Sequence, residues 1–116
     1  TRMTSQTPAR LNLMIIDDDL AFRQGLANCL QQFPDLEVVL EADSRSEALQ
    51  FLKSWFESHT TLDVVILSLD LGQSVAGTQG AIALCQAVRS RYPTLPILAM
   101  SQIPDPNLLS TAYQAG

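Results

Sequence analysis

Four apolar runs, each followed by a segment with helical periodicity, constrain the fold of this chain more than any other feature of its sequence. The runs cover residues 11–16, 36–42, 62–69 and 96–101. A near-continuous apolar run such as LNLMII is typical of a strand that is covered on both faces. Strands that alternate with helices through short links form a parallel sheet with right-handed crossovers. The sequence therefore predicts an α/β fold, a doubly wound parallel sheet built from four βα units.

The helical segments carry start and stop signals of their own. Pro34 ends the first, whose predicted apolar face is Phe22, Leu26, Cys29, Leu30 and Phe33. The second opens with the capping-box residues Ser44 and Glu47, and its predicted apolar face is Ala48, Leu49, Leu52, Trp55 and Phe56. In the third we expect Ile82, Leu84, Cys85 and Val88 to point inward. Both cysteines are thus predicted to be buried small hydrophobic residues.

Length and charge limit the domain organisation and the partners. The chain has 116 residues, which suits one domain; residues 1–10 are predicted to be a flexible tail and residues 11–116 the folded domain. The net charge of −5 argues against direct binding to nucleic acid or to an anionic membrane. No apolar run approaches the ~18 residues of a transmembrane helix. The absence of a CxxC motif suits a reducing, cytoplasmic setting.

Polar residues follow three of the predicted strands, where open parallel sheets place their sites. The first strand ends in Asp17, Asp18 and Asp19, the third in Ser68 and Asp70, and the fourth in Ser101. Clustered carboxylates repel one another, and a hard cation with oxygen ligands, such as Mg²⁺, relieves that repulsion. The alternative is a solvated loop in which Asp18 or Asp19 caps the first helix.

Several segments together resemble the receiver domain of two-component response regulators. They are LMIIDDDLAFRQGL, FPDLEVVLEADSRSEALQFL, LDVVILSLDL, RYPTLPILAMS and DPNLLSTAYQAG, and they cover residues 11–116. FRQGLANCLQQFPDLEVV is especially similar to the subfamily whose receivers precede a helix-turn-helix output domain. The resemblance implies the flavodoxin-like (CheY-like) fold and a signalling function rather than an enzymatic one.

The resemblance also assigns roles to individual positions. Asp17 and Asp18 match the acidic pair that holds Mg²⁺, and Ser101 matches the hydroxyl residue that contacts the phosphoryl group and reorients on activation. The phosphoacceptor aspartate should follow the four apolar residues after Asp63. Ser68 stands at that position.

Two further departures from the family pattern concern the loop after the third strand and the end of the chain. The loop LGQSVAGTQG lacks the family's Met-Pro-Gly sequence and is about four residues longer, if Gly80 is the second glycine of the family's pattern. The fifth βα unit, with its aromatic residue and its lysine, would begin past Gly116. The sequence is therefore expected to be part of a longer protein.

Two functional hypotheses follow from a serine at the acceptor position. A carboxylate forms a labile acyl phosphate with the help of Mg²⁺, whereas a serine hydroxyl needs a base and yields a stable ester. The single histidine, His59, precedes the third strand. The first hypothesis is therefore a phosphorylation-independent pseudo-receiver that binds a protein partner or a C-terminal output domain. The second is an active receiver that uses Asp70, which would share the Ser68 face if the strand continued.

The loss of the acceptor carboxylate also affects the expected cation and assembly. Weak Mg²⁺ binding through Asp17, Asp18 and a backbone carbonyl is one expectation. The other is that Ser68 donates a hydrogen bond to Asp17 or Asp18 instead. An exposed fourth strand would allow a homodimer by edge pairing. A small doubly wound enzyme is disfavoured, because the loop after the first strand is anionic and would repel phosphate.

Overall fold

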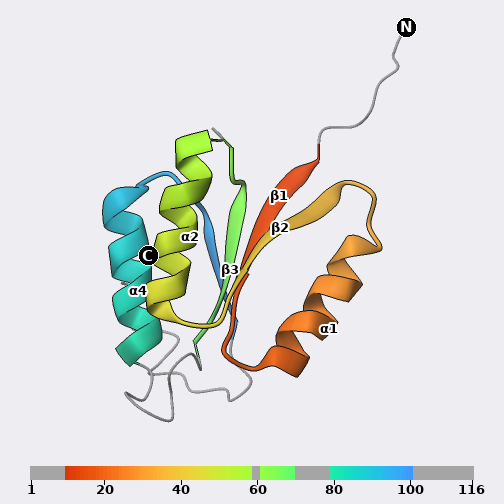
Figure 1. Ribbon diagram of the computed structural model, residues 1–116, viewed down its shortest axis with the longest axis horizontal. Coiled ribbons are helices and arrows are strands. Elements are labelled where there is room, and N and C mark those ends of the chain that lie inside the picture. The colour runs from red at the N-terminus through yellow and green to blue at the C-terminus, as the bar shows by residue number, and fades with distance from the viewer. Residues whose placement is uncertain (1–9, 59–60, 70–78, 101–116) are drawn as a thin grey trace, which may run out of the picture.

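The computed structural model describes residues 10–58, 61–69 and 79–100. Within these residues, strands and helices alternate along the chain (Figure 1). The elements are β1 (Leu11–Ile16), α1 (Leu20–Gln31), β2 (Leu36–Ala42), α2 (Arg45–Ser58), β3 (Val64–Ser68), α4 (Gln79–Arg91) and β4 (Ile97–Met100). In these ranges no helix has both the length and the apolar character needed to cross a bilayer. The predicted βα alternation is confirmed, whereas the predicted last helix lies outside the described residues.

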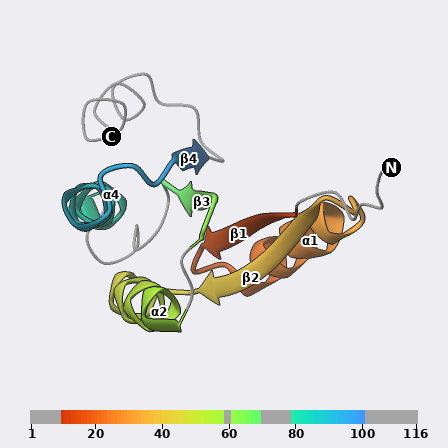
Figure 2. The same cartoon turned by 90° about the horizontal axis from the view of Figure 1, so that it is seen from above.

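The four strands form one parallel sheet in the order β2-β1-β3-β4. Figure 2 shows α1 on one face of this sheet and α2 and α4 on the other. Helices on both faces of a parallel sheet define the doubly wound architecture that the sequence predicts. Because all strands run in the same direction, their carboxyl ends meet along one edge of the sheet.

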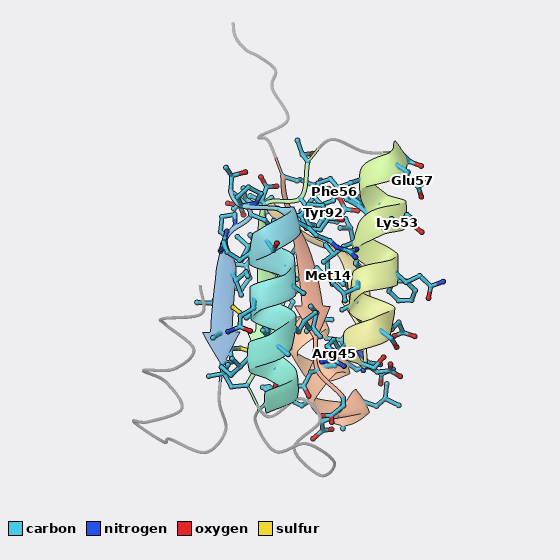
Figure 3. The ribbon with its side chains drawn as sticks, turned by 90° about the vertical axis from the view of Figure 1, so that its left-hand side faces the viewer. Met14, Arg45, Lys53, Phe56, Glu57 and Tyr92 are labelled. Carbon is cyan, nitrogen blue, oxygen red and sulfur yellow. The ribbon has the colours of Figure 1, made fainter. Side chains whose placement is uncertain are left out.

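The larger core lies between the sheet and the helices α2 and α4. Met14 and Ile16 of β1 face this core. They pair with Val65 and Leu67 of β3, which face it too. Figure 3 shows α2 and α4 side by side in front of the sheet, where the rings of Phe56 and Tyr92 stack with centroids 4.8 Å apart. The buried members of this core are Met14, Ile16, Ala42, Ala48, Leu52, Leu62, Val65, Leu67, Leu69, Ala81, Leu84, Cys85, Val88 and Leu95. The apolar faces predicted for the second and third helices are therefore confirmed.

Helix α1 departs from its predicted packing. Its buried residue is Ala27, and Cys29 is exposed, so the prediction of a buried Cys29 was wrong. The half-buried residues Leu26 and Leu30 mark the side of α1 that packs on the sheet. Because each residue turns the helix by about 100°, Cys29 lies at the edge of that side. Phe33 lies beyond the end of α1 and is 56% exposed. Its predicted place on the apolar face was also wrong.

A register shift in the β1–β2 pair determines which way the end of β2 faces. Leu13 pairs with Val38 but Met14 pairs with Leu40, so β2 has one extra residue at this point. A shift by one residue moves every following side chain to the other face of a sheet. Glu41 therefore pairs with Ile15, on the face that α1 covers, and Ala42 faces the larger core.

Candidate functional site

Strand pairing brings Asp17 and Ser68 together at the carboxyl edge of the sheet. Ile16 pairs with Leu67; Ser68 is the next and last residue of β3, and Asp17 directly follows the end of β1. Residues at matching positions of neighbouring parallel strands point to the same face. Each of the two is only 3% exposed, and in the described part of the chain they are the buried polar residues. The strand register therefore places the end of β1 beside the end of β3 at this edge of the sheet.

Hydrogen bonds close the acidic loop after β1 into a turn that begins α1. The backbone N–H of Asp17 donates to the Ala42 carbonyl at 3.0 Å, which continues the β1–β2 ladder. The Oδ1 atom of Asp17 accepts a bond from the Asp19 N–H at 2.9 Å. Asp19 is the N-cap of α1, because its Oδ1 accepts from the Phe22 N–H at 3.1 Å. Asp18 is exposed. The loop thus holds one buried carboxylate and two solvent-facing ones.

An arginine that none of the sequence motifs points to lies against this loop. The Nη1 atom of Arg23 donates to the Asp17 carbonyl at 2.7 Å. Its Nε atom donates to Oε1 of Glu41 at 3.2 Å. The available signal in the sequence was spacing, because Arg23 follows the capping Asp19 by four residues and hence lies one helical turn away.

The other predicted site residues lie at the borders of the described part of the chain. Ser68 pairs with Met100, and the Leu69 N–H donates to the Met100 carbonyl at 2.7 Å. Strand β3 ends at Ser68, one residue before the predicted end. Asp70 and Ser101 lie outside the described residues, so their predicted roles stay predictions. Asp70 would share the Ser68 face only in a longer strand, whereas β3 ends at Ser68.

The oxygen atoms at this edge are of the type that binds a hard cation, but few of them are available as ligands. Carboxylate oxygens are the ligands that Mg²⁺ prefers in proteins. Asp17 and Asp18 supply two carboxylates, whereas Ser68 supplies a neutral hydroxyl where the resemblance implies a third carboxylate. Among the described residues, no group of three or more His, Cys, Asp or Glu side chains could hold a metal ion. If Mg²⁺ bound at this edge, Asp17 and Asp18 are the side chains that would hold it, and the ion would offset their negative charge.

A comparison with protein families agrees with this fold and with this edge of the sheet. The response regulator receiver domain matches residues 13–116. The chain therefore belongs to the receiver domain family of two-component response regulators, whose members are signalling modules. This result confirms the resemblance that the sequence motifs indicated.

Individual relatives are similar over almost the whole chain. The probable transcriptional regulatory protein NarL of Mycobacterium tuberculosis is 27% identical over 114 residues, which are 98% of this chain and 48% of that protein. The transcriptional regulatory protein DegU of Brevibacillus brevis is 24% identical over 107 residues, which are 92% of this chain and 41% of that protein. The chain thus spans less than half the length of these curated relatives.

Solved structures give the same result for the fold. The signal receiver domain of the putative response regulator NarL from M. tuberculosis superposes with a TM-score of 0.77 and is 27% identical; the match covers 94% of this chain and 80% of that one. CheY of Borrelia burgdorferi, in a CheX–CheY complex with BeF₃⁻ and Mg²⁺, has a TM-score of 0.78 at 15% identity, with coverages of 95% and 75%. The predicted CheY-like fold is confirmed.

Proposed function

We propose that this receiver domain signals without phosphorylation, as the regulatory or docking part of a larger protein. The observation that carries the proposal is Ser68, a neutral residue buried beside Asp17 at the position of the family's acceptor carboxylate. An acyl phosphate needs a carboxylate nucleophile, and serine cannot form one. The output of the domain then depends on which protein binds it and not on a covalent modification at this edge.

The carboxyl edge of the sheet still has an acidic character that favours weak cation binding. Asp17 and Asp18 offer oxygen ligands, but the loss of one of three anionic groups lowers the affinity for Mg²⁺. Metal binding is accordingly an accessory property in this proposal. It provides no route to phosphotransfer, because the attacking carboxylate is the group that Ser68 replaces.

Covalent labelling tests the proposal against its alternative, in which Asp70 is the acceptor. The chain is incubated with a small-molecule phosphodonor and Mg²⁺, and its intact mass is measured before and after hydroxylamine treatment. We expect no hydroxylamine-labile phosphoryl adduct on the unmodified chain. An adduct that disappears in Asp70→Asn but persists in Ser68→Ala would establish the alternative and refute the proposal.

Partners follow from charge and from family membership. The net charge of −5 makes this domain a poor direct ligand for nucleic acid. A C-terminal output domain or a separate protein is the proposed partner, in the cytoplasm and without enzymatic activity of the domain itself. Strand β4 is the outermost strand on its side of the described sheet. For residues 1–116 taken by themselves, pairing along β4 is the proposed route to a homodimer. Sedimentation velocity at several protein concentrations tests the dimer.

A further inference from the structure

Arg23 is tied to the acidic loop and to the neighbouring strand by three hydrogen bonds. Its backbone N–H donates to the Asp19 carbonyl at 2.9 Å, as part of the first turn of α1. Its guanidinium bridges the Asp17 carbonyl and the Glu41 carboxylate, at 2.7 and 3.2 Å. A guanidinium is planar and always charged, so these two contacts hold a permanent positive charge in a fixed place.

A second ion pair that also uses a glutamate of β2 shows what is unusual about this one. Arg10 and Glu37 form a pair at 3.7 Å near the other end of β1 and β2, with side chains 56% and 49% exposed. The side chains of Arg23 and Glu41 are only 13% and 36% exposed. Solvent screens an exposed pair strongly and a half-buried pair much less. The charge of Arg23 therefore acts on its surroundings more strongly than that of Arg10.

The register shift in β2 is what makes this arrangement available. Without the extra residue after Val38, Glu41 would face the larger core, and the guanidinium would have no carboxylate on the α1 side. The bulge thus supplies the partner that fixes Arg23 beside the loop. Bulges commonly re-aim a side chain in this way.

We propose that Arg23 is a built-in cation of the acidic loop, which offsets the charge of Asp17, Asp18 and Asp19 and so lowers the affinity of this edge for divalent cations. Three carboxylates on successive residues repel one another, and a positive charge held within a few residues relieves that repulsion. The same charge repels a divalent cation that approaches the loop. Arg23 is a positioning residue in this account, because its side chain contacts the loop backbone and Glu41.

This inference deepens the proposed function, because a loop with its own cation keeps its conformation without a bound metal. The two proposals can fail separately. The first is tested by a covalent adduct, and this one by the affinity for a cation in the absence of any phosphodonor.

The experiment measures the binding of Mn²⁺, as a probe for divalent cations, by electron paramagnetic resonance of the free ion. Arg23→Gln is expected to raise the affinity at least about fivefold, because one unit charge has that effect on a divalent ion about 8 Å away even at the dielectric constant of water. Arg10→Gln is the matched control and should leave the affinity unchanged. Arg23→Lys keeps the charge but loses the planar fork, so its affinity should stay near that of the unmodified chain. The rise should shrink as the ionic strength increases from about 0.05 M to about 0.5 M.

Each outcome supports or overturns the proposal. An unchanged or lowered affinity in Arg23→Gln overturns it, and so does an equal rise in Arg23→Lys, which would show that loop geometry and not charge sets the affinity. Circular dichroism shows whether Arg23→Gln is folded. If it is not, Arg23→Met serves instead, because it keeps much of the length of the side chain without its charge and should raise the Mn²⁺ affinity by a similar factor. An unchanged or lowered affinity in that variant overturns the proposal.

Discussion

Replacing Ser68 by aspartate should destabilise the protein, because it places a second carboxylate beside the buried Asp17. The two residues occupy matching positions on neighbouring strands, and each is 3% exposed. Neighbouring strands lie about 4.8 Å apart. Two unit charges about 5 Å apart at an effective dielectric constant of about 20 repel by about 3 kcal/mol. Ser68→Asn has the same shape without the charge and isolates this term.

The measured quantity is the free energy of unfolding from urea titrations at pH 7. We expect Ser68→Asp to be about 3 kcal/mol less stable than Ser68→Asn. The repulsion and the burial both raise the pKa of the paired carboxyls above that of the unfolded chain. The difference should therefore shrink as the pH falls and one of the pair becomes protonated, and be largest near neutral pH.

Added Mg²⁺ gives a second check on the same pair. A cation that binds the folded state stabilises it by mass action, so Mg²⁺ should stabilise Ser68→Asp more than Ser68→Asn. If the two variants unfold at the same urea concentration at pH 7, with or without Mg²⁺, Asp17 and residue 68 do not form the close pair described above. The assignment of this edge as a degenerate acceptor site would then be wrong.

Two further predictions concern the core and the cysteines. Leu52→Ala should lower the free energy of unfolding by about 3 kcal/mol because Leu52 is fully buried, whereas Leu20→Ala, at a residue 55% exposed, should cost less than about 1 kcal/mol; urea titration compares them. Under native conditions a thiol reagent should modify Cys29 rapidly and Cys85 slowly, and equal rates would contradict the packing of α4. Burial raises the pKa of the Cys85 thiol above its ordinary value of 9.0, although Arg89 opposes this. Because the folded state favours the neutral thiol, stability should fall as the pH rises past 9.0, and Cys85→Ala should fall less.

Strand and helix positions could be predicted well where hydrophobic periodicity was strong. The run LNLMII predicts β1 with the observed bounds, because a strand covered on both faces must be apolar throughout. The third run was predicted to begin at Leu62, but β3 begins at Val64. Leu62 is buried in the core without being part of the strand. Asp63 donates its backbone N–H to the Asn12 carbonyl at 2.8 Å, and its Oδ2 atom accepts from the Asn12 N–H at 2.7 Å. A hydrophobic residue predicts burial, and a residue such as Leu62 can be buried without pairing in a strand.

The site could be predicted only in part, for a similar reason. The order of the strands and their parallel direction were enough to bring Asp17 and Ser68 to one edge. Arg23 was missed because its role depends on Glu41 facing α1. That orientation results from a bulge in β2, which leaves no mark in the hydrophobic pattern of LEVVLEA. The burial of Cys29 was predicted wrongly because α1 packs mainly against the two strands β1 and β2. A helix in that position buries a narrower face than the spacing of its apolar residues predicts.

The most direct test of the account is intact-mass spectrometry of the unmodified chain and of Ser68→Asp, side by side, after incubation with a phosphodonor and Mg²⁺. We expect a hydroxylamine-labile phosphoryl adduct on Ser68→Asp, because the restored carboxylate lies beside Asp17, and no such adduct on the unmodified chain. An adduct on the unmodified chain would contradict the central claim, since it would show that another carboxylate serves this receiver as its acceptor.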